Sequence, residues 1–244
     1  MVLKLLKQTV RQRRLSWAGV LDDSPHRPTK VGDWALWMVP LNAQSVVYSF
    51  GVGDNVAWDL ELIRRLGCTV HAFDPTPASI AWVGGQSLPL QFVFHDLGIS
   101  NFDGELPFYP PRKAGSTHFS QEWRGGLFGR QEPVLGRVAR LATIMRSLGH
   151  SRLDVLKLDV EGSEFDAIPD ILASGIEIDQ LLVEIHYHFR SRSFRAGLTL
   201  IEQIKARGME CIHVSPRGFE FSFVRRGLHA CRVHERSEMH HSRS

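Results

Sequence analysis

Residues 46–80 read VVYSFGVGDNVAWDLELIRRLGCTVHAFDPTPASI, a run in which two short apolar segments flank a helical pattern. The apolar segments at 45–50 and 68–73 predict strands, and residues 54–66 predict the helix between them. Gly51 and Gly53 follow the first strand and allow the backbone to turn tightly into that helix. A strand, a glycine turn, a helix and a second strand together predict two parallel strands joined by a crossover helix.

The same alternation continues along the rest of the chain. Further strands are predicted at 90–94, 153–160, 180–187, 209–214 and 219–224, and further helices at 77–83, 139–148, 164–174 and 197–207. This rhythm predicts an α/β fold, a doubly wound and mostly parallel sheet with helices on both faces. The turn SPRG at 215–218 suits a hairpin, so the last strand is expected to be antiparallel.

The length of 244 residues suits one domain, which is expected to span 33–228. Before it, residues 1–32 are predicted to form a basic helix, at 1–14, and an irregular lead-in, because prolines and a glycine are scattered through 24–44. Residues 229–244 are predicted to be a flexible tail. Inside the domain, residues 98–137 break the rhythm with glycines and prolines and are expected to be an insertion or lid.

Composition and charge exclude several classes of protein. A net charge of +3 is too small to indicate a nucleic-acid partner, and no window approaches the roughly 18 apolar residues of a transmembrane segment. Lys4 and Lys7 interrupt the first apolar run, so no signal peptide is predicted. The three cysteines form no CxxC pair, which indicates neither a disulfide framework nor a zinc site and favours the cytoplasm. The sequence leaves open whether the chain forms a homo-oligomer.

The first strand and its glycine turn predict a cofactor site. Ligands of open α/β sheets bind at the carboxyl ends of the strands, where the strand order reverses. Asp74 ends the second strand 21 residues after Gly53, close to the spacing of about 20 expected of an acid that binds a ribose. The alternative is that Asp74 only caps the turn that Pro75 and Pro77 fix.

Two cofactors fit this turn, and the residues favour one of them. A dinucleotide needs a third small residue at position 56, where this chain has Val56, and its pyrophosphate would be repelled by Asp54. S-adenosylmethionine has no phosphate: its ammonium group can bind Asp54 and its carboxylate the backbone N–H groups of the turn. An NAD-linked oxidoreductase therefore remains the alternative enzyme, and a binding protein without activity the alternative class.

Residues 46–80, together with LDVLKLDVEGSEFDAI at 153–168 and LLVEIHYH at 181–188, resemble the FkbM family of methyltransferases. The resemblance covers about residues 33–225. It implies a class I methyltransferase fold, which is Rossmann-like, with seven strands in the order 3-2-1-4-5-7-6 and the seventh antiparallel. It also implies S-adenosylmethionine as the donor and oxygen as the usual acceptor atom, here a hydroxyl of a small-molecule natural product or a sugar.

One residue departs from the pattern of class I methyltransferases, which often carry an acid two residues before the first glycine. Ser49 stands at that position here. The residues expected to bind the cofactor are Ser49, Gly51, Gly53, Asp54, Asp74, Pro75, Thr76, Asp96, Leu97 and Asp159. Of these, Asp96 and Leu97 follow the third strand and are expected near the adenine.

Two strand ends carry the groups expected to act on the acceptor. Alternation places Lys157, Asp159 and, if the strand continues, Glu161 on one face. On the next strand it places Glu184, His186 and His188 on one face. The catalytic residues are therefore expected to be Asp159, Glu161, Glu184 and His186, unless Lys157 and Asp159 are only a structural pair and His186 only a core residue.

Asp159, Glu184 and His186 also suit a Mg²⁺ or Mn²⁺ site, because they offer two carboxylates and an imidazole. His186 is otherwise expected to be the general base. A candidate lid over the acceptor is the segment 98–137, whose aromatic residues include Phe102, Phe108, Tyr109, Phe119, Trp123 and Phe128.

Overall fold

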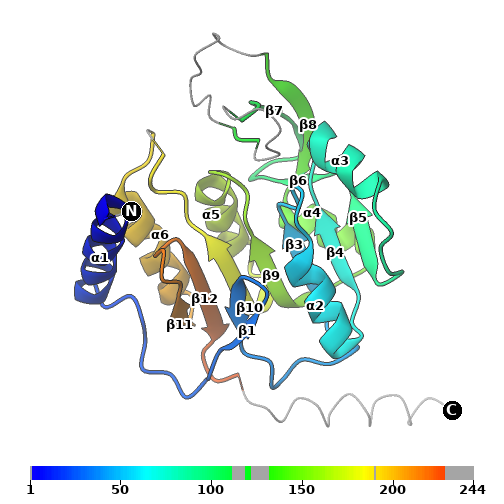
Figure 1. Cartoon of the computed structure of the whole chain (residues 1–244). Helices are drawn as coiled ribbons and strands as arrows, with labels where there is room; N and C mark the ends of the chain where they lie inside the picture. Colours follow the sequence, from blue (N-terminus) through cyan, green and yellow to red (C-terminus); the bar gives the residue numbers. More distant parts are fainter. Residues whose placement is uncertain (1, 112–118, 122–131, 190, 229–244) are drawn as a thin grey trace, which may run out of the picture.

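A seven-stranded sheet forms the centre of the computed structural model, which describes residues 2–111, 119–121, 132–189 and 191–228 (Figure 1). Its strands are β3 (Val47–Phe50), β4 (Val70–Phe73), β5 (Phe92–His95), β9 (Arg152–Leu158), β10 (Glu177–Glu184), β11 (Met209–Val214) and β12 (Glu220–Arg225). They lie in the order β11-β12-β10-β9-β3-β4-β5, and β12 runs antiparallel to both of its neighbours. Read from the other edge, this is the expected order 3-2-1-4-5-7-6, so the predicted Rossmann-like fold is confirmed.

Helices cover both faces of the sheet, as the strand composition requires. The helices are α1 (Val2–Trp17), α2 (Ala57–Leu66), α3 (Pro77–Gly84), α4 (Leu141–Leu148), α5 (Glu164–Ser174) and α6 (Phe194–Ala206). One buried cluster joins α4, α5 and α6 to one face of the sheet, and a second joins α2 to the other face. Six of the seven residues of β9 are buried, which is the pattern of a parallel strand covered on both sides.

Two additional sheets form where the sequence predicts irregular structure. The strands β1 (Thr29–Val31) and β2 (Trp34–Leu36) pair as an antiparallel hairpin inside the predicted lead-in. The predicted domain boundary between residues 32 and 33 falls in the turn of this hairpin. Val31, Trp34 and Leu36 are buried in the cluster that contains α2, so the hairpin packs on the main sheet and is not an irregular approach to it.

The second of these sheets lies in the predicted insertion. Its strands are β6 (Gly98–Ile99), β7 (Gly104–Phe108) and β8 (Val134–Ala139), in the order β6-β8-β7. Because β8 runs to Ala139, the predicted helix start at 139 is wrong, and α4 begins at Leu141. Glycines and prolines in this segment predicted irregular structure, but two of them are compatible with strands. Pro107 is tolerated on the edge strand β7, and Gly136 leaves room for the ring of Phe108. The aromatic residues Trp123 and Phe128 lie outside the described residues, as does the predicted tail 229–244.

The basic N-terminal helix docks on the domain through its arginines. The guanidinium of Arg11 lies 3.7 Å from the ring centroid of Phe219, and that of Arg14 lies 3.9 Å from the ring of Phe194. Leu15 is buried in the main cluster. Figure 1 accordingly shows α1 beside α6, at the edge of the sheet formed by β11. Cation–π contacts of this kind use the positive charge for packing, so these two arginines are not simply solvated.

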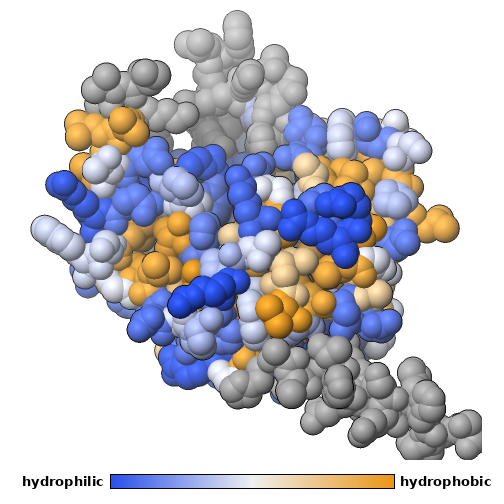
Figure 2. Space-filling view, turned by 60° about the horizontal axis from the view of Figure 1, so that its bottom comes forward, coloured by the Kyte–Doolittle hydropathy of each residue, from blue (hydrophilic) through white to orange (hydrophobic). Residues whose placement is uncertain are grey.

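Exposed apolar side chains are dispersed over the surface. Figure 2 shows them on one face in separate patches with polar residues between them. The large ones come from different elements, for example Leu5 and Leu6 of α1, Leu90 before β5 and Leu135 of β8. Such scattered exposure is ordinary for a folded domain. Among the described residues, no helix has the length and apolar character needed to cross a bilayer.

Candidate active site

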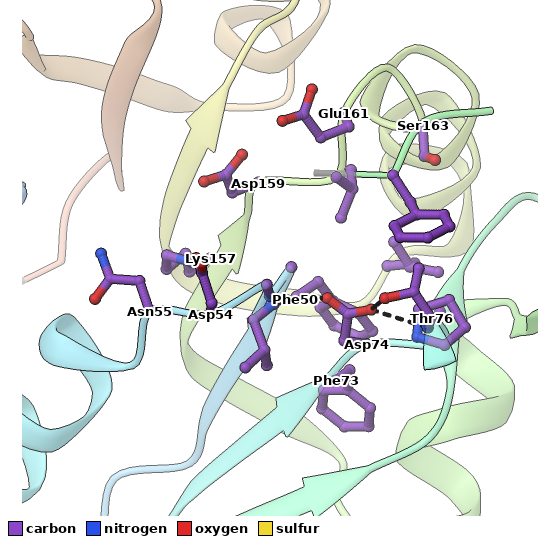
Figure 3. Close-up of a pocket in the computed structure, with 18 of the residues that line it drawn as sticks. Phe50, Asp54, Asn55, Phe73, Asp74, Thr76, Lys157, Asp159, Glu161 and Ser163 are labelled. Atoms are coloured by element: carbon purple, nitrogen blue, oxygen red, sulfur yellow. Dashed lines mark hydrogen bonds between the residues drawn. The ribbon is translucent and has the colours of Figure 1, made fainter. Parts of the chain in front are cut away.

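A pocket lies where the order of the parallel strands reverses, between the carboxyl ends of β3 and β9. It encloses about 960 Å³ of empty space, part of which is open to solvent. Three segments form most of its wall: 50–55 after β3, 73–76 at the end of β4, and 157–163 at the end of β9 (Figure 3). This is the position at which open α/β sheets bind their ligands, as predicted.

The glycine turn brings the end of β3 against the end of β9. Gly51 has a φ of 88°, and a Cβ atom built on it would lie 1.7 Å from the carbonyl oxygen of Asp159. No side chain therefore fits at position 51 unless the two strands separate. The helix α2 begins at Ala57 and not at the predicted residue 54, so the turn is longer than expected. The side chain of Asn55 accepts a hydrogen bond from the N–H of Ala57 at this delayed start.

Asp74 joins the end of β4 to the glycine turn. Its Oδ2 accepts hydrogen bonds from the N–H groups of Val52 and Gly53, at 3.1 and 3.0 Å. Its Oδ1 accepts from the N–H and the hydroxyl of Thr76, at 3.0 and 2.7 Å (Figure 3). A carboxylate accepts about four hydrogen bonds, so these four donors occupy its capacity. Asp74 thus holds the shape of the pocket, and it also lines the wall together with Pro75 and Thr76.

The other residues expected to bind the cofactor fall into two groups. Gly53 and Asp54 line the pocket, whereas Ser49 is buried in β3 and does not. Asp96 and Leu97 are not part of the wall either: the Asp96 side chain is 64% exposed, 3.9 Å from Arg137, and Leu97 packs on the core. Gly98 and Ile99 line the pocket instead, because the chain turns into β6 just after β5.

The predicted catalytic residues come together beside the pocket. Nε2 of His186 lies 3.4 Å from Glu161 Oε2, 3.8 Å from Glu184 Oε1 and 4.0 Å from Asp159 Oδ1. Asp159 and Glu161 also line the pocket, and Figure 3 shows both carboxylates on the side away from Asp74. We call these four residues the carboxylate–histidine cluster. His188, in contrast, is exposed, because β10 ends at Glu184 and its alternation does not continue that far.

The ends of the strands explain where the alternation fails. β9 ends at Leu158, two residues before the predicted end, so the strand alternation does not extend to Glu161. Lys157, Asp159 and Glu161 nevertheless all line the pocket. Lys157 lies near the rings of Trp34 and Trp58, on the side of α2. Glu161 has a φ of 50° and is the non-glycine residue with positive φ in the described part of the chain. Such a conformation is strained, and strained residues cluster at functional sites.

Glu164 is a member of this site that the sequence analysis missed. Its side chain is fully buried, and it accepts hydrogen bonds from the N–H groups of His186 at 2.7 Å and Gly162 at 2.9 Å. Nδ1 of His186 lies 3.2 Å from the same carboxylate and is the donor, since an ionised carboxylate only accepts. The available signal was an acid in the first turn of a helix that directly follows a functional strand.

The surrounding charges set the protonation of the cluster. Burial lowers the pKa of His186, but the hydrogen bond to Glu164 and the charges of Glu164, Glu161 and Asp159 outweigh it and raise the pKa to about 9. Burial, reinforced by the charge of Asp159, raises the pKa of Glu184 to about 7. His186 therefore keeps both ring protons at neutral pH when only these acids surround it. In that state it cannot serve as the general base that the sequence favours.

The same groups have the arrangement of a cation site. One ligand atom from each of Asp159, Glu184 and His186 lies within 4.8 Å of the other two. The Glu164–His186 hydrogen bond fixes the imidazole so that Nε2 faces these carboxylates. Carboxylate–histidine pairs of this kind orient metal ligands in many proteins. The donor set of two carboxylates and one imidazole thus fits a hard divalent ion.

Comparison with known proteins assigns the chain to a family. The model of the methyltransferase FkbM domain matches residues 46–232. The chain belongs to this family. The FkbM match begins one residue before β3, and it includes the glycine turn, Asp74, Glu164 and the carboxylate–histidine cluster. The helix α1 and the β1–β2 hairpin lie outside it.

Two curated relatives carry related sequences. The probable methyltransferase-like protein 24 of Homo sapiens is 28% identical over 151 residues, which are 61% of this chain and 34% of that protein. The protein of the same name from Rattus norvegicus is 25% identical over 183 residues, 70% of this chain and 43% of that protein. This FkbM chain therefore matches less than half the length of each of these relatives.

Proposed function

We propose that this FkbM chain transfers a methyl group from S-adenosylmethionine to a hydroxyl group of a small molecule or sugar. The observation that carries the proposal is the position of the carboxylate–histidine cluster. It adjoins a pocket formed by the glycine turn, Asp74 and the end of β9, at the point where the strand order reverses. A donor pocket beside a group of proton acceptors is the arrangement that methyl transfer to a hydroxyl needs.

The charges of the pocket favour this donor over a dinucleotide. Six acidic residues line the wall, namely Asp33, Asp54, Asp59, Asp74, Asp159 and Glu161. Lys157 is the basic residue that lines it in the described part of the chain. An acidic wall repels a pyrophosphate and attracts a sulfonium cation, because charges interact strongly in a partly enclosed site. The wall thus supports S-adenosylmethionine against NAD, in agreement with Val56 at the third position of the turn.

The cluster fits a divalent cation on the acceptor side. Asp159, Glu184 and His186 would hold Mg²⁺ or Mn²⁺, and Glu164 would keep His186 in the neutral tautomer with Nε2 free to coordinate. A bound cation supplies positive charge that favours the deprotonated form of an acceptor hydroxyl. It also balances the three carboxylates that face Nε2 of His186.

Glu161 is the residue of this chain that we assign as the general base. It lines the pocket, lies in the cluster and is not one of the three cation ligands. Its backbone is strained, and its carboxylate lies 3.4 Å from Nε2 of His186 while the residue lines the donor pocket. Phe108 and Phe119, from the predicted lid segment, complete the wall and exclude water from the reacting groups.

A thermal-shift measurement tests the donor. S-adenosylhomocysteine at about 100 times its Kd should stabilise the folded chain by about 2.7 kcal/mol and raise Tm by about 5–10 °C. NAD at the same concentration should leave Tm unchanged, because the acidic wall repels its pyrophosphate. If NAD stabilises the chain and the sulfur nucleoside does not, the oxidoreductase alternative replaces this proposal.

A further inference from the structure

One part of the pocket, which we call the recess, is lined by residues that have no role in the transfer step proposed above. Its wall there is formed by the turn of the β1–β2 hairpin, by α2 and by β9, which contribute Asp33, Trp34, Trp58, Asp59 and Lys157. The hairpin turn lies directly on α2, since a Cβ atom on Gly32 would be 3.1 Å from the Cα of Trp58. The hairpin therefore closes one end of the pocket.

This recess contains two opposite charges, both deeply buried. Asp59 is 2% exposed and Lys157 is 5% exposed. Nζ of Lys157 lies 5.3 Å from the ring centroid of Trp34 and 5.8 Å from that of Trp58. Burial raises the pKa of Asp59, while the charge of Lys157 opposes the shift. Within the described part of the chain, the Lys157 ammonium and the Asp59 carboxylate form no direct ion pair of 4.0 Å or less.

Polar atoms around these charges lack partners. Asp59 Oδ1, Trp58 Nε1 and Ser49 Oγ are fully buried, and within the described part of the chain they make no hydrogen bond. The Ser49 hydroxyl is close enough to lower the pKa of Asp59, although it does not meet hydrogen-bond geometry. Buried polar groups without partners are destabilising, so natural sites rarely keep them unless a ligand satisfies them.

The glycine turn does not supply what the amino-acid end of the donor needs. Its carboxylate was expected to bind the backbone N–H groups of the turn, but the N–H groups of Val52 and Gly53 donate to Asp74. An α-amino acid carries an ammonium and a carboxylate a few ångströms apart. The recess offers the complementary set: an acceptor on Asp59, and donors on Lys157 and on Trp58 Nε1.

We propose that Asp59 and Lys157 form the subsite for the zwitterionic amino-acid end of S-adenosylmethionine. Asp59 accepts from the ammonium group, and Lys157 and Trp58 Nε1 donate to the carboxylate. The acid that Ser49 replaces on the strand is then supplied by α2. This inference rests on the proposed function, because it assumes the same donor.

Two ligands that share a nucleoside test the subsite. S-adenosylhomocysteine has the amino-acid end, and 5′-methylthioadenosine lacks it. By calorimetry, Asp59→Asn and Lys157→Met should each weaken S-adenosylhomocysteine about ten- to a hundred-fold, the loss of one charge-assisted contact. The affinity for 5′-methylthioadenosine should stay at its wild-type value. As the matched control, Glu61→Gln changes a carboxylate of the same helix that contacts Arg64 and Arg65, and it should alter neither affinity.

The outcomes separate this proposal from the proposed function. If the wild-type chain binds neither nucleoside, the subsite and the proposed function are both wrong. The subsite is wrong if neither variant weakens tight binding of S-adenosylhomocysteine, or if the variants weaken both ligands equally. Either result is still compatible with S-adenosylmethionine as the donor. Each single variant leaves one buried charge without its opposite charge and is therefore at risk of misfolding. The double variant Asp59→Asn/Lys157→Met removes both charges, and it must also lose affinity for S-adenosylhomocysteine alone.

Discussion

Removal of divalent cations should abolish methyl transfer, and added Mg²⁺ or Mn²⁺ should restore it. Three carboxylates surround Nε2 of His186, and without a cation this imidazole keeps both protons at neutral pH. A bound cation contributes several kcal/mol of charge stabilisation, so its loss should lower kcat by about 10²–10³-fold. Initial rates after exhaustive EDTA treatment and dialysis, with and without each cation, measure the effect.

The control for this experiment is the donor pocket. Affinity for S-adenosylhomocysteine should survive chelation, because Asp74 and Thr76 line the pocket on the side away from the carboxylates of Asp159 and Glu161 (Figure 3). Full activity of the chelated chain would contradict the cation site. The carboxylate–histidine cluster would then act without metal, and Glu184, whose pKa is raised to about 7, would be a second candidate for the base.

Glu161→Gln should lower kcat by about 10²–10⁴-fold, the usual contribution of a general base. The amide keeps the size of the side chain and one hydrogen-bond acceptor, but it takes up no proton near neutral pH. Affinity for S-adenosylhomocysteine should stay within a few-fold of wild type, since the donor does not depend on this proton transfer. Rates at saturating donor and acceptor give kcat directly.

Glu105→Gln is the matched control, because Glu105 is exposed on β7 and lies outside the pocket. It should have wild-type kcat. A Glu161→Gln variant with wild-type turnover would show that the strained residue only shapes the wall. The acceptor proton would then have to go to Asp159 or Glu184.

The sheet could be predicted from the sequence because the residues of each strand show a local apolar pattern. Short apolar runs alternate with helical patterns. A strand buried on both faces, such as β9, is an almost continuous apolar run, which is typical of a parallel sheet. The meeting of the glycine turn, Asp74 and Asp159 follows from the rule that carboxyl ends of parallel strands share one edge. The approach of His186 to Asp159 follows in the same way, since β9 and β10 are neighbours.

Other features depend on contacts between distant segments, which no local pattern reveals. The β1–β2 hairpin has a suitable two-residue turn in Gly32 and Asp33, but its short strands are stabilised by burial of Val31 and Leu36 against α2. Asp59 lies in the first turn of an amphipathic helix, where an acid normally faces solvent, and only the tertiary structure places it beside Lys157. Asp96 was expected near the adenine, but the turn into β6 places Gly98 and Ile99 in the pocket wall.

The central claim is the transfer of a methyl group to a hydroxyl oxygen, and one measurement tests it most directly. The chain is incubated with methyl-labelled S-adenosylmethionine, a divalent cation and a panel of small hydroxyl compounds and sugars, and products are identified by mass spectrometry. The account predicts an O-methyl ether that carries the label, with one S-adenosylhomocysteine formed for each product molecule. A chain that binds the donor but transfers no label, or that places the label on nitrogen or carbon, would contradict it.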